Sequence, residues 1–258
     1  MAHQAIPVTP IPALRGAYDN YVWLFPTGEG QVAAVDPGEA GPVLAHLKRE
    51  NLMLTHILIT HHHADHTGGV EEIQRSTGAY TIGSVHDRHR LPVLDRMVDD
   101  GDTIQIGPHT MEVMHTPGHT TGHVVYLLED LLFCGDTLFS YGAGRLFEGT
   151  PTQMWKTMKR LRALPDQMRA CPAHEYTLTN LTFCADLEPD NREIAELKRW
   201  AMGMMDRDEP TLPNLMEKEK RLNPFLRCDE PTMAALVGLE GVSPPDVLAE
   251  VRARRNQY

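Results

Sequence analysis

Short apolar runs, each closed by Gly, Pro or Asp, dominate the first two thirds of the chain. They are QVAAVDPG (31–38), THILIT (55–60), AYTIGS (79–84), TMEVMHTPG (110–118), HVVYLLE (123–129) and LLFCGD (131–136). Runs of this length and composition predict buried β-strands. Helical segments are expected between them at 40–49, 69–76 and 152–164. In the last of these, Met154, Met158, Leu161 and Leu164 recur at helical spacing.

The pattern changes after about residue 176. DNREIAELKRWAMGMMDR (190–207) predicts a helix, and no strand-like run follows it. The final stretch, SPPDVLAEVRARRNQY (243–258), carries a helix start signal, because Ser243 and Asp246 match a capping box and Pro244 suits the first helical position. Glu250 and Arg254 form an i,i+4 pair on that helix. We therefore expect an α/β domain over residues 1–175 and a smaller helical domain over 176–258.

Composition places the 258-residue chain among soluble globular proteins, with 41% hydrophobic and 23% charged residues. A net charge of −11 argues against a general nucleic-acid or membrane-surface role. No secretory signal is expected at the start, and the apolar runs are shorter than the ~20 residues that span a bilayer. The four cysteines are scattered without a C-x-x-C pair, which favours reduced, buried thiols in a cytoplasmic protein: Cys134, Cys171, Cys184 and Cys228.

The densest chemistry lies in THHHADHTGG, residues 60–69, directly after a predicted strand. His61 and His63 alternate and should point the same way in an extended segment, whereas His62 should point elsewhere. Asp65 and His66 follow where the chain should turn into a helix, so they can face a second position nearby. A polar loop and a single metal site are the simpler readings, but two pairs of ligands suit two metals better than one.

Further ligands are expected at later strand ends. His119 follows the Pro-Gly turn of TMEVMHTPG, Asp136 follows LLFCG, and His174 lies in CPAHEY. A carboxylate such as Asp136 has two oxygens and can bridge two ions. Histidines suit zinc or iron, and carboxylates also tolerate manganese.

Several neighbouring residues are expected to be supporting rather than ligating. His62 and His115 should be solvent-facing or structural, and a core or supporting position is favoured for His123. Asp36, at the end of AAVDPG, is equally compatible with a turn residue and with a hydrogen-bond partner for a ligand histidine.

THHHADH, TPGHT, CGDT and AHEY, in that order, resemble the metallo-β-lactamase superfamily. Five further blocks resemble the hydroxyacylglutathione hydrolase (glyoxalase II) family within it: IPALRGAYDNYVWLF, GRLFEGT, AHEYTLTN, NPFLR and VRARRNQY. The resemblance implies an αββα sandwich followed by a helical domain. It also implies two divalent metals, with zinc favoured over iron or manganese: His61, His63 and His119 on one, Asp65, His66 and His174 on the other, and Asp136 bridging. A hydroxide would lie between them, which makes Asp65 and Asp136 catalytic as well as ligating.

For the substrate, the resemblance implies contacts from Arg145, Tyr176, Arg252 and Arg255. The last two lie three residues apart on a predicted helix, so they share a face and can converge on one carboxylate. The alternative is an ordinary solvated basic face. Phe147 stands where some family members have tyrosine, so one hydroxyl contact to the thiol-peptide should be missing, and Ala143 stands where many have cysteine.

The expected reaction is hydrolysis of S-(2-hydroxyacyl)glutathione, above all S-D-lactoylglutathione, to D-lactate and glutathione, a step in methylglyoxal detoxification. The chain has no G-x-S-x-G elbow, and a metal-bridging hydroxide needs no side-chain nucleophile. The alternatives are a glutathione persulfide dioxygenase with a single iron, a β-lactam or phosphodiester hydrolase of the same fold, and a metal-dependent sensor without turnover. No nucleic-acid, membrane or obligate protein partner is expected.

Overall fold

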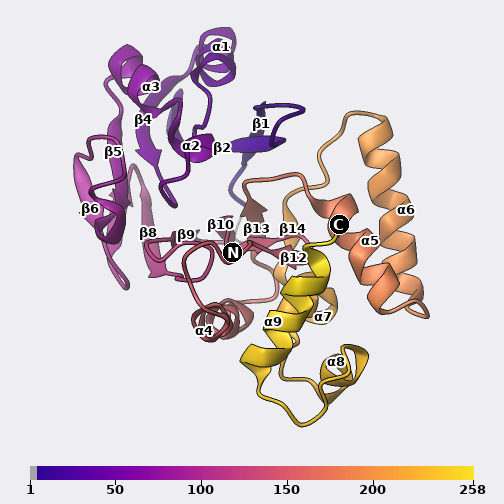
Figure 1. Ribbon diagram of the computed structural model, residues 1–258. Helices are drawn as coiled ribbons and strands as arrows, with labels where there is room; N and C mark the ends of the chain where they lie inside the picture. Colours follow the sequence, from indigo (N-terminus) through magenta and orange to yellow (C-terminus); the bar gives the residue numbers. More distant parts are fainter. Residues whose placement is uncertain (1–4) are drawn as a thin grey trace. The chain divides into compact units, whose positions relative to one another are not determined.

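The computed structural model of the protein describes residues 5–258 (Figure 1). Residues 1–4 belong to the stretch in which no secretory signal is expected, and they lie outside the described residues. The chain divides into two compact units. The first comprises residues 1–116, 122–136 and 171–174, and the second comprises 117–121, 137–170 and 175–258.

The first unit contains a six-stranded sheet in the order β1-β2-β3-β4-β5-β6. Its strands are β1 (Thr9–Ala13), β2 (Asn20–Gly28), β3 (Gln31–Val35), β4 (Met53–Leu58), β5 (Tyr80–Ser84) and β6 (Arg96–Val98). The last four run parallel. Helices α1 (Ala40–Glu50) and α3 (Val70–Thr77) lie side by side against one face (Figure 1). Val43, Leu47 and Ile73 from these helices join Ile57 of the sheet in one buried apolar cluster.

A second sheet of this unit faces the first. It is formed by β7 (Thr103–Ile106), β8 (His109–His115), β9 (Val124–Leu128), β10 (Leu131–Gly135) and the end of β13 (Arg169–Pro172). Phe25 and Phe133 pack across the interior with ring centroids 5.2 Å apart. Trp23 donates its indole N–H to the Pro172 carbonyl at 2.8 Å. The buried indole N–H therefore has a partner, and the two sheets form a sandwich whose apolar inner faces exclude water.

The outer edge of the first sheet is β1, which pairs with β2 on one side only. It carries Pro10 and Pro12 at alternate positions. Five registered residue pairs join β1 to β2 despite these prolines, so the missing N–H groups do not interrupt the ladder.

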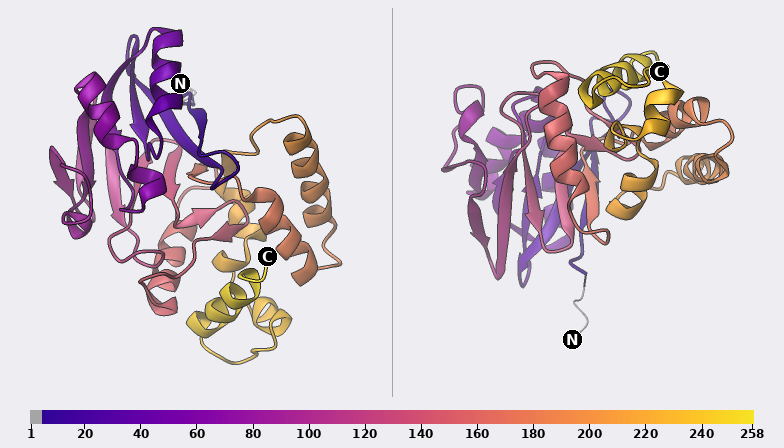
Figure 2. Two further views of the ribbon diagram at one scale, coloured as in Figure 1. Left: turned by 45° about the horizontal axis from the view of Figure 1, so that its top comes forward. Right: turned by 90° about the horizontal axis from the view of Figure 1, so that it is seen from below.

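The second unit contains the short hairpin β11 (Leu138–Phe139) and β12 (Gly142–Ala143), the strand β14 (Asn214–Leu215) and most of the helices. The helices are α4 (Pro151–Arg162), α5 (Thr177–Leu187), α6 (Arg192–Asp206), α7 (Met216–Leu222), η2 (Pro224–Leu226), α8 (Pro231–Leu236) and α9 (Pro244–Arg255). Helices α5 and α6 pack as a pair, and α9 packs on α4 (Figure 2). Short segments of the first unit are α2 (Ala64–Thr67) and η1 (Val85–Asp87).

The six predicted strands and the predicted helices are confirmed, with ends shifted by one to three residues. Two local expectations are wrong. A two-residue strand, β14, does follow residue 176, where it pairs with Arg169 and Ala170. The capping box at α9 does not form, because the Ser243 hydroxyl donates to the Asp246 carboxylate at 2.6 Å and not to a backbone group. The Glu250–Arg254 pair is confirmed at 2.8 Å.

The structure also bears on the expectations for the cysteines and for membrane-spanning helices. All four cysteines are buried and free of disulfides, as expected. Within residues 5–258, no helix has both the length and the apolar character needed to cross a membrane.

Candidate metal centre

The loop after β4 places its histidines as the alternation predicts. His61 and His63 approach each other, with 3.0 Å between His61 Nε2 and His63 Nδ1. His62 turns away, and its Nδ1 lies 3.1 Å from the buried carboxylate of Asp87. His115 is also remote from the group, stacked on the His86 ring at 4.3 Å. The structure therefore separates the expected ligands of this loop from the histidines expected to be structural.

The turn into α2 depends on close backbone packing. A Cβ at Gly38 would lie 1.7 Å from the Asp65 carbonyl oxygen, so the loop after β3 can approach α2 only with glycine there. Gly135, at φ +47°, similarly allows the end of β10 to approach Thr60. These contacts bring the loops after β3, β4 and β10 to the same end of the sandwich, where Asp36, His61 and Asp136 lie.

Five of the predicted ligands meet in the first unit. The ligand atoms of His61, His66 and Asp136 lie within 4.8 Å of one another, and so do those of Asp65, His66 and His174. His66 Nε2 lies 3.3 Å from an Asp136 oxygen and 3.4 Å from an Asp65 oxygen. His174 Nε2 lies at nearly the same distances from the same two carboxylates, 3.2 and 3.4 Å. The carboxylate of Asp136 is thus shared between two histidines from different elements.

Hydrogen bonds behind the group orient its rings. The Asp36 carboxylate accepts from the backbone N–H and the hydroxyl of Thr60, both at 2.7 Å, and from His66 Nδ1 at 3.1 Å. His174 Nδ1 donates to the Tyr18 carbonyl at 2.8 Å. With Nδ1 donating in each ring, Nε2 faces the shared carboxylates and is the nitrogen that could bind a metal after losing its proton. The hydrogen bond considered for Asp36 is present, and it goes to a predicted ligand histidine.

His123 belongs to this supporting layer, as favoured from the sequence. Its Nε2 accepts the Asp136 backbone N–H at 3.1 Å, and its ring stacks on His61 at 4.8 Å. Asn20 was missed in the sequence analysis. Its side-chain amide donates to the Asp65 carbonyl at 3.1 Å. The one sequence signal for Asn20 is that it lies in AYDNYVWLF, a block that resembles the hydrolase family.

The electrostatics of the group are those of buried carboxylates facing imidazoles. For His66, burial lowers the pKa, but the charges of Asp136 and Asp36 outweigh burial and raise it well above the usual value. Burial raises the pKa of Asp65, whereas the hydrogen bond and charge of His66 act oppositely and bring it to about 2. Asp136 is held well below its usual range against burial by His174 and His66. The site therefore keeps its carboxylates ionised and attracts a cation, either a proton on His66 or a metal.

These donors fit a divalent metal. His66 Nε2 is buried, and it meets only the Asp136 and Asp65 carboxylate oxygens, at 3.3 and 3.4 Å, which are long contacts for a polar atom shielded from water. Imidazole nitrogens and carboxylate oxygens are the ligands that zinc, iron and manganese accept. The buried, convergent lone pairs of this group are therefore better explained by a metal site than by a polar loop.

His119 lies in the second unit, in the segment 117–121. Its Nδ1 donates to the Arg145 carbonyl at 2.8 Å, and its own carbonyl accepts the Phe147 backbone N–H at 3.1 Å. The Phe147 ring packs edge-on to the His119 ring at 5.2 Å, yet the side chain is 62% exposed. His119 thus has the same Nδ1-protonated tautomer as His66 and His174, with Nε2 as its remaining donor.

The predicted substrate residues of the helical region are partly used for structure. Arg252 donates to the Ala143 carbonyl at 2.7 Å and lies over the Phe225 ring at 5.1 Å, and Arg255 donates to Asn180 Oδ1 at 2.7 Å. Both are more than nine-tenths buried. They are not a solvated basic face, which was the alternative left open by the sequence.

Burial and neighbouring positive charge act on both arginines. Burial, followed by the positive charges of Arg255 and Arg145, lowers the pKa of Arg252 to about 9. Burial and Arg145 also lower the pKa of Arg255. Cations that repel one another away from water are destabilising until an anion neutralises them. Tyr176 is the residue before α5, and its ring centroid lies 5.2 Å from that of Phe139.

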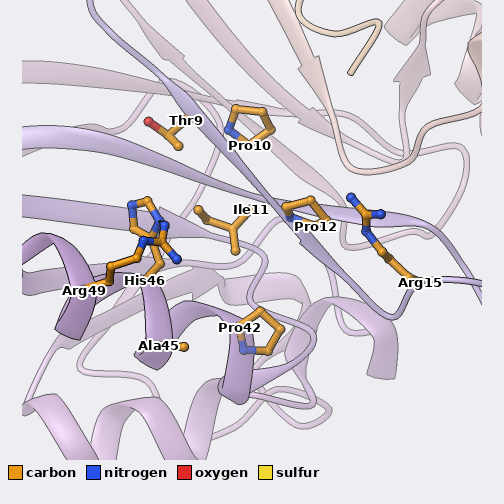
Figure 3. Close-up of a pocket in the computed structure, with 9 residues that line it drawn as sticks. All are labelled: Thr9, Pro10, Ile11, Pro12, Arg15, Pro42, Ala45, His46 and Arg49. Carbon is orange, nitrogen blue, oxygen red and sulfur yellow. Dashed lines mark hydrogen bonds between the residues drawn. The ribbon is translucent and has the colours of Figure 1, made fainter. Parts of the chain in front are cut away.

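A separate hollow of about 480 Å³ opens between β1 and α1 (Figure 3). Its lining is Thr9, Pro10, Ile11, Pro12, Arg15, Pro42, Ala45, His46 and Arg49. It contains none of the predicted site residues and no carboxylate, so it does not compete with the histidine–aspartate group as the candidate site.

Known protein families and named enzymes are similar to this chain over nearly its whole length. Residues 15–174 match the metallo-β-lactamase superfamily, and residues 175–258 match the family described as hydroxyacylglutathione hydrolase C-terminus. A hydroxyacylglutathione hydrolase of Methylococcus capsulatus is 43% identical over 96% of this chain and 97% of its own. That of Rhodobacter capsulatus is 44% identical over 97% and 98%. The chain belongs to the hydroxyacylglutathione hydrolase family of metal-dependent hydrolases.

Solved structures agree with membership of this family at the level of the fold. ETHE1 from Myxococcus xanthus has a TM-score of 0.66 and 25% identity, covering 96% of this chain and 98% of its own. The BLEG-1 B3 metallo-β-lactamase also has a TM-score of 0.66, at 23% identity over 85% and 99%. The expected fold class, a metallo-β-lactamase fold followed by a C-terminal helical domain, is therefore confirmed. Members of this fold bind divalent metals, and the group around His66 and Asp136 is where this chain could hold them.

Proposed function

We propose that the protein hydrolyses S-(2-hydroxyacyl)glutathione thioesters, with S-D-lactoylglutathione as the principal substrate, and so serves methylglyoxal detoxification. The observation that carries this proposal is the C-terminal family match together with two buried arginines inside it, Arg252 and Arg255. Glutathione thioesters are carboxylate-bearing, and paired guanidinium groups are suited to carboxylates. The histidine–aspartate group supplies a metal site for the chemistry.

We infer a centre of two divalent metals, with zinc favoured and iron or manganese accepted by the same donors. His61, His63 and His119 would hold one metal, Asp65, His66 and His174 would hold the other, and the two oxygens of Asp136 would let it serve both. The 3.0 Å approach of His61 to His63 supports the first set, and the group of Asp65, His66 and His174 supports the second. The position of Asp136 within 3.3 Å of two histidines from different elements supports the bridge.

Two observations support His119 as a metal ligand: the hydrogen bond made by its ring and the short loop that carries it. Its Nδ1 is occupied by the Arg145 carbonyl, which directs the Nε2 lone pair elsewhere. The segment that carries it leaves the second sheet after Thr116 and returns at His123, and the Thr116 N–H bonds the His123 carbonyl at 2.8 Å. His123 itself stacks on His61. These two observations support the assignment of His119 to the same metal as His61 and His63.

Bound metals would supply a hydroxide near neutral pH and polarise the thioester carbonyl. The residues of this chain do the rest. Asp36, His123 and the Tyr18 carbonyl hold the ligand rings and Asp136 in place. Asp65 and Asp136 stay ionised, so their negative charges would offset the positive charge of bound metals. We assign them as the catalytic carboxylates. The thiolate that leaves needs little assistance, since a free thiol has a pKa near ~8.5.

Substrate binding is assigned to Arg145, Arg252, Arg255, Tyr176 and Phe147. The net charge of −11 repels an anionic thioester at long range, so affinity has to come from a local cationic pocket. We propose residues 1–175 as the catalytic region and 176–258 as the substrate-binding region. Phe147 offers ring contact but no hydroxyl, so one hydrogen bond to the thiol-peptide is absent.

The strongest rival is a glutathione persulfide dioxygenase with a single iron. The relatives at 43–44% identity over nearly the whole chain are named hydroxyacylglutathione hydrolase, which favours the hydrolase. A β-lactam or phosphodiester hydrolase is disfavoured by the match over residues 175–258. Four buried free thiols support a cytoplasmic location. The proposed reaction requires no nucleic acid, membrane or protein partner.

Metal analysis combined with hydrolysis assays tests the proposal. The metal-loaded protein should contain two equivalents and split S-D-lactoylglutathione, with turnover lost on chelation and regained on zinc addition. A panel with S-mandeloylglutathione, nitrocefin and bis(p-nitrophenyl) phosphate would rank the alternatives. One iron per chain with oxygen consumption on glutathione persulfide would favour the dioxygenase and overturn the proposal.

A further inference from the structure

The hairpin that precedes Arg145 depends on side chains from elsewhere. Strands β11 and β12 have two residues each, too few to be stable alone. Residues 138–143 are all buried, and Tyr141 has a left-handed φ of 58°, which is unfavourable for an aromatic residue. The contacts that hold this segment therefore set the position of whatever is attached to it.

Glu219, on α7, is the central contact. It is fully buried, and its Oε2 accepts the Tyr141 backbone N–H and the Asn223 side-chain amide, both at 2.9 Å. Its Oε1 accepts the Asn214 amide at 2.6 Å. Burial raises the pKa of Glu219 to about 7, while the hydrogen bonds from Asn223, Tyr141 and Asn214 favour the ionised form. This carboxylate therefore fixes the Tyr141 turn against helix α7.

Asparagines continue the same network. Asn223 also donates to the Gly142 carbonyl at 2.9 Å, and Asn180 donates to the Ser140 carbonyl at 2.9 Å. A Cβ at Gly142 would lie 2.5 Å from the Asn180 amide nitrogen, so hairpin and side chain are in tight contact. The side chains of Asn180 on α5, Glu219 on α7 and Asn223 at the end of α7 thus hold the backbone of hairpin residues 140–142.

The network ends on the two arginines of α9. Ala143, the last residue of the hairpin, offers its carbonyl to Arg252, and Asn180 offers its Oδ1 to Arg255. Arg145 follows two residues after Ala143, and its charge acts on both arginines. The cations assigned to substrate binding are therefore all attached to the segment that Glu219 fixes.

We propose that Glu219 is a positioning residue for substrate binding. By holding the hairpin 138–143, it keeps Arg252, Arg255 and Arg145 converged on the carboxylates of the glutathione portion. This inference rests on the proposed function, because it needs a glutathione thioester as the ligand. The hydrogen bonds of Glu219 go to Tyr141, Asn214 and Asn223, none of which is a proposed metal ligand, so we expect its effect on affinity for the thiol-peptide and not on the hydrolytic chemistry.

A two-substrate comparison tests the proposal. The first substrate is S-D-lactoylglutathione, and the second is S-lactoyl-N-acetylcysteamine, whose thiol has no carboxylate. Glu219→Ala removes the acceptor of the Tyr141 N–H and of the Asn214 amide, so KM for the glutathione thioester should rise about tenfold or more. Turnover of the neutral thioester and metal content should stay within about twofold of wild type. Glu217→Ala, an exposed glutamate on the same helix, is the matched control and should change neither substrate.

Conservative variants separate positioning from plain structural support. Glu219→Gln keeps one oxygen for Tyr141 and Asn223, and the Asn214 amide can turn to accept from the new amide group. Its KM rise should be only a few-fold, and adding Asn214→Ala should bring it towards the Glu219→Ala value. If Glu219→Ala does not fold, this pair carries the test. An unchanged KM in the folded variants, or an equal loss on both substrates, would overturn the proposal.

The two proposals fail in different ways. If the wild-type protein splits both thioesters with equal kcat/KM, the assignment of glutathione as substrate fails before any variant is made. If the wild type prefers the glutathione thioester and the Glu219 variants keep that preference, only the positioning role fails. Calorimetric binding of S-methylglutathione to each variant gives the same ranking without turnover.

Discussion

His119 and Arg145 are joined by a hydrogen bond of 2.8 Å, from the imidazole Nδ1 of one to the backbone carbonyl of the other. One residue is a proposed metal ligand and the other a proposed substrate cation. The Phe147 N–H bonds back to the His119 carbonyl, so the two segments hold each other at two points. The segment that carries the proposed ligand and the segment that carries the proposed substrate cation are therefore held together through their backbone carbonyls.

Metal binding should release protons. In the metal-free protein Asp136 and Asp36 overcome burial and raise the pKa of His66, so this ring carries a proton at pH 7, whereas a ligand histidine must be neutral. We expect about one proton released per chain from this ring, and metal affinity that falls on acidification from pH 8 to pH 6. Calorimetric titration with zinc in two buffers of different ionisation enthalpy measures the number. Identical enthalpies in both buffers would contradict this expectation.

The same shifts predict how stability of the metal-free protein depends on pH. The raised pKa of His66 contributes stability that is complete below pH 6.5 and is lost as pH rises through its higher folded value. The lowered pKa values of Asp65 and Asp136 contribute stability above about pH 4 that is lost on acidification through their folded values. Thermal melting of chelated protein should therefore be highest between about pH 4 and 6.5 from these groups. Asp136→Asn should flatten both limbs, and an unchanged profile would argue against the pairing.

Asp136→Ala should abolish hydrolysis, whereas His62→Ala should leave most of it. Asp136 is shared by His66 and His174, while His62 faces Asp87 away from the group. Removing a ligand disables the chemistry, and a loop residue away from it falls within the near-neutral range. Rates on S-D-lactoylglutathione, together with metal content, measure the contrast. Similar rates for the two variants would mean that the bridge is misassigned.

Asp36→Asn should weaken metal binding by roughly 10–100-fold without changing the ligand set. Asparagine tolerates the left-handed φ of 53° at this position, but it replaces the oxygen that receives His66 Nδ1–H with a less basic group or a donor. Competition with a fluorescent chelator gives the affinity. Asp87→Asn is the matched control, because Asp87 is equally buried but holds His62, which is not in the group. Equal effects from the two substitutions would remove the special role of Asp36.

Arg252→Met with Arg255→Met should raise KM for the glutathione thioester by about tenfold per lost contact, with a smaller fall in kcat. Methionine keeps apolar volume beside Phe225, which limits the loss of stability from removing the bonds to Ala143 and Asn180. Arg254→Ala is the control on the same helix, because Arg254 is engaged by Glu250. A double variant with wild-type KM would show that these arginines serve the fold alone.

How far the sequence predicts the centre differs between its parts. Period-two alternation orients His61 and His63 together and His62 away, and strand ends identify Asp136 and His174. These are local rules of backbone geometry, so they hold without tertiary knowledge. The supporting contacts of Asn20 and Tyr18 arise from the meeting of distant strands. The Asn20 contact and the carbonyl of Tyr18 carry no signal in the local pattern.

In the helical region, periodicity predicts the helices and the basic pair on α9. It does not predict that this pair is buried. Arg252 and Arg255 are buried because Ala143 and Asn180 approach them from parts of the chain that lie 109 and 75 residues away. The failed Ser243 cap has a similar cause at shorter range, since the Asp246 carboxylate competes successfully for the hydroxyl.

Pro10 and Pro12 on β1 affect how this protein behaves at high concentration. Successive residues of a strand direct their N–H groups to opposite edges, so Pro10 and Pro12 share an edge, and the intact pairing with β2 places the two missing donors on the outer one. A strand from another molecule would meet carbonyls there without the matching N–H groups. At the far edge, β6 has only three residues. Both margins of the sheet are thus poor templates for intermolecular strand addition, which protects the folded protein from edge-to-edge aggregation.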